Sequence, residues 1–285
     1  MSETESPLEP GLYVTATPIG HARDITLRAL DVLKACDAIA AEDTRVTSKL
    51  LAIYGISKPL VSYNDHNAAR ERPRLLQRLR EGERIALVSD AGTPLVSDPG
   101  YKLVREAVEE GLRVEAVPGA SALLTALVLS ALPSDRFLFA GFLPARSGER
   151  KSALAELKAV PATLIFFESP RRLAESLTDM AEILGERAIA VGRELTKFHQ
   201  EVRRGDVAAL AAAYCNEPVP KGEVTIVVAP PQARAPDSAR IDSLLVQALA
   251  FMPVRAAADL VAEALAVARH ATYDRALALK TKANE

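Results

Sequence analysis

The sequence predicts an α/β protein, with two α/β domains in succession and a small helical module at the C-terminal end. Short apolar segments alternate with segments of helical periodicity through most of the 285 residues, which is the pattern of a mainly parallel sheet covered by helices. The alternation restarts after residues 132–134, and this restart predicts a second domain. A Pro/Ala-rich segment at 230–236 then precedes a strongly helical, alanine-rich tail.

Five strand–helix units are predicted in the first half of the chain. Their strands are short apolar runs that end in turn residues, as strands buried on both faces of a sheet do. These runs cover residues 12–17, 37–41, 60–63, 85–89 and 114–117. Helical periodicity predicts helices over 26–35, 44–54, a segment ending near 80, 99–110 and 121–130. Gly55 and Gly111 stop two of them, because glycine readily ends a helix.

The second half repeats the alternation. Strands are predicted over 137–141, 163–168, 188–193 and 223–229, and helices over 151–158, 171–184 and 207–214. Apolar positions at helical spacing predict two or three short helices within 241–280. We therefore expect a disordered tail at 1–10, an N-terminal α/β domain at 11–120, a second α/β domain at 121–232 and a helical module at 238–285.

Composition excludes several classes of protein. The chain has 49% apolar and 25% charged residues, as globular proteins do, and its net charge of −2 provides no global attraction to nucleic acid. Any RNA contact must therefore come from a local basic surface. No apolar run reaches the roughly 20 residues that span a membrane. The two cysteines and four histidines show no ligand spacing, so we expect no metal, and free thiols in a reducing cytoplasm.

The segment IALVSDAGTPLVSDPG at 85–100 is the most informative stretch for function. Its apolar run ends in Asp90 and a small turn, and ligands of open α/β sheets bind beyond the carboxyl ends of the strands. Asp90, with Gly92 after it, therefore predicts the floor of a small-molecule site. Asp98 followed by Pro99 is typical of a helix start, so we expect Asp98 only to cap the next helix.

Other predicted strands end in tight or polar turns on the same edge. Pro18 and Gly20 form a stiff turn after the first strand, which is a weak signal by itself. Four polar residues at 42–45 follow the second strand, where they could either cap the next helix or contact a polar substrate. Four polar residues at 64–67 likewise follow the third strand. Neither GxGxxG nor GxxxxGK[ST] occurs, so no dinucleotide fingerprint and no P-loop is supported.

Clusters of basic residues are the candidates for contact with an anionic partner. Arg70, Arg74 and Arg78 lie at i, i+4 and i+8 on one side of a helix, which costs roughly a few tenths of a kcal/mol per pair unless solvent or an anion compensates. We favour a solvated face, and Pro73 predicts a break or kink in this helix. Further basic groups are Arg146, Arg150 and Lys151, the pair at 171–172 and the pair at 203–204.

Taken together, eight blocks of the sequence resemble one family, the bacterial 16S rRNA (cytidine-2′-O)-methyltransferases of the RsmI type within the tetrapyrrole-methylase superfamily. The blocks occur in order between about residues 11 and 230, at 17–20, 24–30, 42–45, 89–100, 118–122, 141–144, 168–172 and 193–197. The tail resembles the family's small C-terminal module. The chain has His21-Ala22 where the family has Asn-Leu, and Gln200 where it has Glu.

The resemblance implies two α/β domains of the tetrapyrrole-methylase type, S-adenosylmethionine bound in the cleft between them, and a homodimer. It also implies 2′-O-methylation of a cytidine in the decoding centre of 16S rRNA, within the small ribosomal subunit. By the same analogy, the cofactor-binding residues are Pro18, Gly20, Asp90, Ala91, Gly92, Thr93, Ser121, Ala122, Glu168 and Leu195.

A ribose hydroxyl that attacks the methyl group must lose its proton to a positioned base. The candidate bases are Asp43, Glu42, His66 and a deprotonated Lys197, and we favour a carboxylate of the Glu42-Asp43 pair. Arginine pairs with phosphate in a bidentate fork. The predicted RNA contacts are Arg45, Arg70, Arg74, Arg150, Arg171, Arg193 and Lys197.

Two other functions compete with this one. C-methylation of a tetrapyrrole intermediate belongs to the same superfamily, but blocks 42–45 and 193–197 and the helical tail argue against it. A non-catalytic ribosome-assembly factor that senses the cofactor would share most of the same residues. Labelled methyl found in rRNA, in a porphyrin-like pigment or in neither distinguishes the three.

Overall fold

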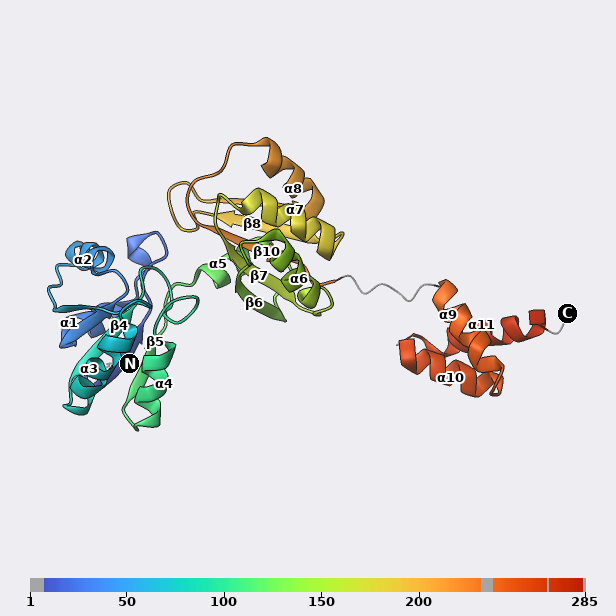
Figure 1. The fold of residues 1–285 in the computed structure, drawn as a ribbon, viewed down its shortest axis with the longest axis horizontal. Coiled ribbons are helices and arrows are strands. Elements are labelled where there is room, and N and C mark those ends of the chain that lie inside the picture. The colour runs from blue at the N-terminus through green and yellow to red at the C-terminus, as the bar shows by residue number, and fades with distance from the viewer. Residues whose placement is uncertain (1–7, 232–237, 266, 284–285) are drawn as a thin grey trace. The chain divides into compact units, whose positions relative to one another are not determined.

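The computed structural model describes residues 8–231, 238–265 and 267–283 (Figure 1). The chain divides into two compact units, residues 1–231 with both β-sheets and residues 232–285 with the helical tail. The predicted disordered tail at 1–10 and the Pro/Ala-rich segment at 230–236 fall largely outside the described residues.

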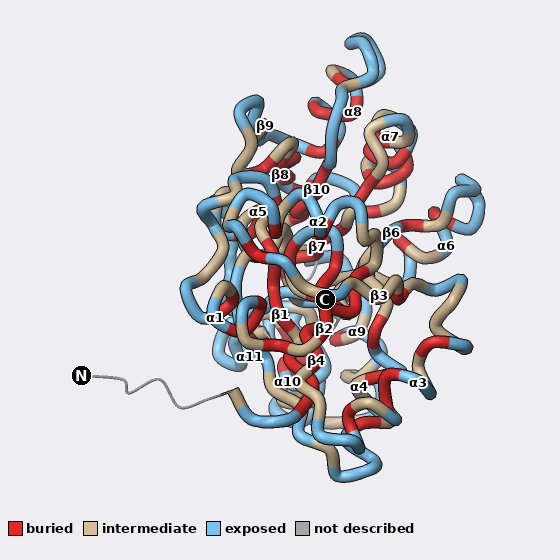
Figure 2. The backbone as a smooth tube through the Cα atoms, turned by 90° about the vertical axis from the view of Figure 1, so that its left-hand side faces the viewer, coloured by how far each residue is buried: buried red, intermediate tan, exposed pale blue. Residues whose placement is uncertain are grey.

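The first unit begins with a sheet in which all neighbouring strands are parallel. Its strands are β1 (Gly11–Thr15), β2 (Ala38–Ala41), β3 (Leu60–Ser62), β4 (Arg84–Val88) and β5 (Val114–Val117), in the order β3-β2-β4-β1-β5. The central strands are apolar and buried because helices cover both faces, as Figure 2 shows. All five predicted strands are confirmed, with ends within two residues of the prediction.

The helices of this half pack on opposite faces of the sheet. α1 (Leu27–Ala35) and α2 (Thr44–Ile53) lie on one face, and α3 (Ala68–Arg80) and α4 (Tyr101–Glu109) lie on the other. A short 3-10 turn, η1 (Ala22–Asp24), precedes α1. The Asp43 carboxylate caps α2 by accepting a hydrogen bond from Arg45 N at 2.8 Å, so the capping interpretation is confirmed for Asp43.

Two details of the helix predictions are wrong, namely a break of the helix at Pro73 and the capping role of Asp98. α3 continues through Pro73, which leaves the carbonyl of Ala69 without a helical donor; Ala69 is exposed, so water can supply that bond. α4 begins at Tyr101 with Gly100 as its N-cap, so Asp98 does not cap it. Gly100 has φ 137°, a conformation that residues with a side chain rarely adopt. Asp98 is therefore available for another role.

A second five-stranded sheet completes the first unit. Its strands are β6 (Phe137–Phe142), β7 (Thr163–Glu168), β8 (Ala188–Arg193), β9 (Glu201–Asp206) and β10 (Val224–Val228), in the order β6-β7-β10-β8-β9. β6 and β7 are parallel, and the other neighbouring pairs are antiparallel. Four of these strands were predicted. β9 was missed because its sequence, EVRRGD, is that of a charged edge strand without an apolar pattern.

Helices cover both faces of the second sheet as well. α6 (Ser147–Leu157), α7 (Leu173–Leu184) and α8 (Val207–Asn216) share a core with one face, and α5 (Ala122–Ser130) packs on the other. α6 begins four residues before the predicted start, because its first turns are polar and give no apolar periodicity. The fold class is confirmed, with the second sheet mixed in direction rather than mainly parallel.

The second unit is a bundle of three helices. They are α9 (Ser238–Leu249), α10 (Val254–Leu265) and α11 (Arg269–Ala283), which confirms the helical tail. Their shared core contains Leu245, Ala258, Val261 and Ala276. Within the described ranges, no helix combines the length and apolarity needed to cross a bilayer. Those ranges also hold no group of three or more His, Cys, Asp or Glu placed to bind a metal.

Candidate functional site

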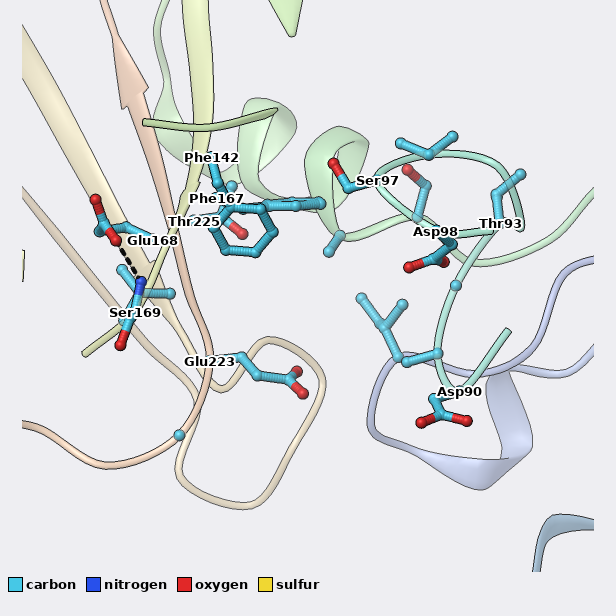
Figure 3. A pocket seen from close by; sticks show the side chains of 18 of the residues that line it. Asp90, Thr93, Ser97, Asp98, Phe142, Phe167, Glu168, Ser169, Glu223 and Thr225 are labelled. Atoms are coloured by element: carbon cyan, nitrogen blue, oxygen red, sulfur yellow. Dashed lines mark hydrogen bonds between the residues drawn. The ribbon is translucent and has the colours of Figure 1, made fainter. Parts of the chain in front are cut away.

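A cavity of about 420 Å³ opens where the carboxyl ends of the first sheet face the second sheet. Ile19 after β1, Glu42 after β2 and the loop 90–98 after β4 form one wall, and the opposite wall comes from the ends of β6, β7 and β10. Figure 3 shows side chains of the two walls pointing toward each other. The volume lies within the range of about 300–1,000 Å³ that small-molecule sites occupy.

The turn after β4 is tied to the turn after β1. Thr17 N donates to the Gly92 carbonyl at 2.8 Å, and Gly92 N donates to the Thr17 carbonyl at 3.0 Å. Gly92 has φ 80°, and a Cβ there would lie 3.3 Å from Ile19 Cγ2. The Thr93 hydroxyl donates to the Ala120 carbonyl at 3.2 Å, which links the same turn to the segment before α5. Glycine thus lets three chain segments converge beside the cavity.

The rest of this loop holds an unusual backbone conformation. Leu95 and Ser97 both have positive φ, at 74° and 67°. Such conformations cost about 1–3 kcal/mol each and persist where the surrounding structure over-determines them, which is common at ligand sites. The loop carries Val96, Ser97 and Asp98 to the cavity.

The opposite wall is held by a buried ion pair. The Glu168 carboxylate is fully buried and accepts hydrogen bonds from Ser169 N at 2.6 Å, Arg172 Nε at 2.8 Å and Ser176 Oγ at 2.6 Å. Arg172 also donates to the Leu143 carbonyl at 3.2 Å. The pair therefore joins the end of β7 to the chain after β6, where the Phe142 and Phe167 rings of the cavity wall meet edge to face at 5.7 Å.

The cavity is acidic. Among the described residues, no Lys, Arg or His lines it, whereas five carboxylates do: Glu42, Asp90, Asp98, Glu168 and Glu223. Glu223 projects toward the wall that bears Asp90 and Asp98 (Figure 3). Burial, reinforced by the charge of Asp90, raises the pKa of Asp98 above its ordinary value. A lining of this charge favours a cationic ligand over a phosphate.

Two hydrogen bonds from backbone amides join the Glu42-Asp43 segment to Asp90. Asp90 N donates to Glu42 Oε2 at 3.3 Å, and Asp43 N donates to Asp90 Oδ1 at 3.0 Å. Burial, and then the charges of Asp98, Asp90 and Asp65, raise the pKa of Glu42. Burial and the Asp43 charge raise the pKa of Asp90 in the same way. Glu42 is thus a carboxylate with enhanced proton affinity at the cavity wall.

Seven of the ten predicted cofactor-binding residues line the cavity, namely Asp90, Ala91, Gly92, Thr93, Ser121, Ala122 and Glu168. Pro18, Gly20 and Leu195 do not. A Cβ on Gly20 would lie 2.5 Å from Lys197 Cγ and 2.9 Å from the Leu195 carbonyl, so this glycine permits a close approach to the β8–β9 loop. Leu195 is buried in the core that includes Ile19. The structure therefore places Gly20 and Leu195 behind the wall, where they support it.

Several lining residues were not predicted from the sequence. They are Ile19, Val96, Ser97, Asp98, Phe142, Phe167, Ser169, Pro170, Gly222, Glu223, Val224 and Thr225. Eight of the twelve lie on β6, β7 or β10 or within two residues of them, and the mixed second sheet brings β7 and β10 together across long stretches of sequence. Seven of the twelve lay inside sequence blocks already singled out, so a signal existed for them: Ile19, Val96, Ser97, Asp98, Phe142, Ser169 and Pro170.

The predicted bases occupy different environments. Glu42 lines the cavity, whereas neither Asp43 nor His66 does. The side-chain hydrogen bonds from Arg45 hold the pKa of Asp43 at about 2, so it binds a proton poorly. Burial opposes charge on Lys197, but its hydrogen bonds to Glu194 and Glu223 outweigh this and raise the pKa of the ammonium. Of the four groups, Glu42 alone combines a place in the lining with raised proton affinity.

Most of the predicted RNA contacts are engaged by carboxylates. Arg45 pairs with Asp43, Arg70 and Arg74 share Glu71, Arg193 pairs with Glu201, and Lys197 pairs with Glu194 and Glu223. The prediction that Arg150 contacts RNA is wrong. Its side chain is 1% exposed and bonds Asp179 at 2.6 Å, so it belongs to the core and cannot reach RNA. Arg171 is exposed and makes no ion pair within the described residues.

Residues 11–211 match the family described as Tetrapyrrole (Corrin/Porphyrin) Methylases, and residues 235–280 match the RsmI C-terminal HTH domain. Over 280 residues the chain is 54% identical to a Mesorhizobium japonicum protein named ribosomal RNA small subunit methyltransferase I, covering 98% of this chain and 95% of that one. The chain belongs to the ribosomal RNA small subunit methyltransferase I family. A member from Escherichia coli O157:H7 is 47% identical and covers 93% and 94% of the two chains. The resemblance drawn from the sequence blocks is confirmed.

Solved structures share the fold of this family member at lower identity. Diphthine synthase superposes with a TM-score of 0.61 at 17% identity, over 76% of this chain and 89% of that one. A uroporphyrin-III C-methyltransferase from Thermus thermophilus, complexed with S-adenosylhomocysteine, gives 0.55 at 19% identity, over 76% and 96%. These likenesses extend the tetrapyrrole-methylase fold to both α/β sheets of the first unit.

Proposed function

We propose that this chain is an S-adenosylmethionine-dependent methyltransferase that methylates the ribose 2′-hydroxyl of a cytidine in the decoding centre of 16S rRNA. The observation that carries the proposal is the cavity at the carboxyl ends of β1, β2 and β4, with its acidic lining. We place the activity in the cytoplasm, on the small ribosomal subunit.

The residues of the cavity fit the methyl donor. Its sulfonium and ammonium charges suit a lining of carboxylates, in particular Asp90 and Asp98. Ser121 makes no side-chain capping bond to α5, so the first amides of this helix remain open to the donor's carboxylate. Phe167 and Ile19 offer apolar surface to its adenine ring. We therefore assign donor binding to the seven predicted residues that line the cavity, together with these additions.

Bound S-adenosylmethionine supplies an electrophilic methyl group on a positively charged sulfur, toward which an alcohol oxygen is directed. We assign Glu42 as the base that takes the proton of this alcohol. Its carboxylate lies in the lining, and burial raises its pKa toward the range in which a general base works best. Asp90 N, which donates to Glu42 Oε2 at 3.3 Å, fixes the direction of the carboxylate.

Phosphates of the RNA meet cations outside the cavity. Arg171 and Lys221 are exposed and make no ion pair within the described residues. Arg171 directly follows Pro170, and Lys221 directly precedes Gly222; both Pro170 and Gly222 line the cavity. Arg45, whose side chain is 85% exposed three positions after Glu42, can exchange the Asp43 carboxylate for a phosphate.

The pair Arg70 and Arg74 surrounds the single carboxylate of Glu71 and keeps an excess positive charge. Both guanidinium groups are about two-thirds exposed, so they remain available to a phosphate, and we retain them as RNA contacts. Arg193 and Lys197 stay in the proposal as charges that a phosphate could recruit from their carboxylate partners.

We also propose a homodimer. The exposed apolar side chains Leu124 and Val128 on α5 support it, because α5 is apolar on nearly all sides and such a helix is usually covered. For the first unit we propose residues 11–120 and 121–232 as its two domains, since α5 shares its core with the second sheet.

Transfer of tritium from labelled S-adenosylmethionine into isolated small ribosomal subunits tests the function. We expect label in 16S rRNA at a single cytidine, in a linkage that resists alkali, because a 2′-O-methyl group prevents the hydroxyl from attacking the phosphate. Label in a uroporphyrin-like pigment but not in RNA, or tight donor binding without any transfer, would contradict the proposal.

A further inference from the structure

The β8–β9 loop, residues 194–200, presents an exposed aromatic ring. Phe198 is 97% exposed, the highest value among the large apolar side chains exposed in the described part of the chain. Its neighbour His199 is also exposed, and the two rings meet edge to face with centroids 5.0 Å apart and an interplanar angle of 84°. An edge contact of this kind leaves a flat face of an aromatic ring available to another partner.

The loop that carries Phe198 is firmly held. Glu194 and Thr196 have positive φ, at 50° and 61°, which persists only where contacts fix the backbone. Those contacts are present: Glu194 N donates to the Glu223 carbonyl at 3.0 Å, Thr196 N donates to Gln200 Oε1 at 2.7 Å, and His21 N donates to Thr196 Oγ1 at 3.1 Å. A loop fixed so thoroughly could bury the ring, yet it holds the ring in solvent.

The loop is also joined to the cavity. Lys197 Nζ donates to Glu223 Oε2 at 3.1 Å and to Glu194 Oε1 at 2.8 Å, and Glu223 lines the cavity. Phe198 therefore follows a residue that contacts the rim directly. Arg23, beside His21, is exposed and has no ion pair within the described ranges. Phe198 is thus next in the chain to a lysine that pairs with a rim carboxylate, and its loop is hydrogen-bonded to the segment that carries Arg23.

We propose that Phe198 is a stacking platform for an unstacked base of the RNA substrate, next to the nucleotide whose ribose enters the cavity. This inference rests on the proposed rRNA methylation. A ribose can reach a cavity only when its nucleotide leaves the regular helical stack, and proteins receive such bases on exposed aromatic faces. Every base has a π-face, so stacking requires no particular sequence. Basic side chains nearby suit the flanking phosphates.

Tryptophan at this position provides a direct test, because the chain has no tryptophan of its own. In Phe198→Trp, a short single-stranded oligocytidylate should quench the emission saturably as its bases stack on the indole. Val108→Trp is the matched control: Val108 is 59% exposed near the end of α4, which leads to the amino end of β5, whereas the cavity lies at the carboxyl ends of the strands of this sheet, and its tryptophan should not respond.

Kinetics on small ribosomal subunits give the second measurement. The KM for subunits should rise about 10- to 100-fold in Phe198→Ala and Phe198→Leu and stay near the wild-type value in Phe198→Tyr, since only an aromatic face stacks. The kcat at saturating subunits and the affinity for S-adenosylmethionine should not change. If Phe198 had only a structural role, its substitution would change kcat, the donor affinity and the melting temperature together.

Three results would overturn the inference. Phe198→Leu could keep the wild-type KM, or Phe198→Trp emission could ignore an oligocytidylate that binds the protein. The emission could also shift to shorter wavelength with rising protein concentration alone, which would assign the ring to a contact between two copies of the chain. If wild-type protein transfers no methyl to RNA, the proposed function itself fails; an active wild type with an unchanged Phe198→Ala refutes only this inference.

Discussion

Glu42→Gln removes the carboxylate that we assign as the base and keeps an oxygen that can accept the hydrogen bond from Asp90 N. General-base catalysis contributes about 10²- to 10⁴-fold, so the single-turnover rate of methyl transfer should fall by that factor, or roughly 3–5 kcal/mol of barrier. Burial and the neighbouring carboxylates raise the pKa of Glu42. The wild-type rate should therefore fall as pH drops through this raised pKa, and the variant should be slow and independent of pH. Rapid-quench transfer of labelled methyl to small subunits measures both.

Asp43→Asn is the matched control, one residue away. Asp43 lies outside the cavity lining, its pKa is about 2, and asparagine can still cap α2. This variant should transfer methyl at nearly the wild-type rate with the wild-type pH profile. The reasoning is refuted if Glu42→Gln keeps the wild-type rate and pH profile, or if Asp43→Asn shows the deep loss instead.

Three further predictions concern the walls and the first sheet. Arg172→Met leaves the buried Glu168 carboxylate without its cation, so we expect a loss of about 3 kcal/mol in the free energy of unfolding and a melting temperature about 6–12 °C lower by calorimetry. Gly20→Ala places a Cβ 2.5 Å from a side chain of the β8–β9 loop. It should cost about 1–3 kcal/mol in urea unfolding yet leave donor affinity unchanged; weaker donor binding with full stability would instead give Gly20 a ligand contact. Side-chain hydrogen bonds from Arg84 hold the pKa of Asp37 at about 2 instead of 3.8. The pair therefore stabilises the fold fully at pH values above 3.8, and this stabilisation is lost as the pH falls toward 2. Asp37→Asn should therefore lower stability at pH 7 by up to about 1 kcal/mol, since both side chains are about one-third exposed, and equal stabilities of the two proteins at pH 7 would count against the pair.

The first sheet and one wall of the cavity could be predicted from local sequence. A parallel strand buried on both faces is a continuous apolar run, so its end is visible in the sequence, and Asp90 and Gly92 follow such an end directly. Because all five strands of this sheet are parallel, their carboxyl ends share one edge, which is why residues after β1, β2 and β4 meet.

The second wall could not be predicted in this way. Its residues lie on β7 and β10, which pair antiparallel although more than fifty positions separate them, and no periodicity encodes that pairing. Charge was also misleading. Arg150 stands in a basic loop of the sequence but is buried against Asp179, 29 positions away, and only the fold reveals this partner. Asp98 precedes a proline and matches a helix start, yet the strained loop extends to Gly100 and turns Asp98 toward the cavity.

Calorimetric titration of S-adenosylmethionine into the wild-type chain and Gly92→Val tests most directly whether this acidic cavity holds the methyl donor. Valine at φ 80° would be strained, and its Cβ would lie 3.3 Å from Ile19 Cγ2 at the cavity wall. We predict one donor bound per wild-type chain and an affinity at least about tenfold lower in the variant, at a melting temperature that shows it still folded. Equal donor affinity in the two proteins would contradict the account.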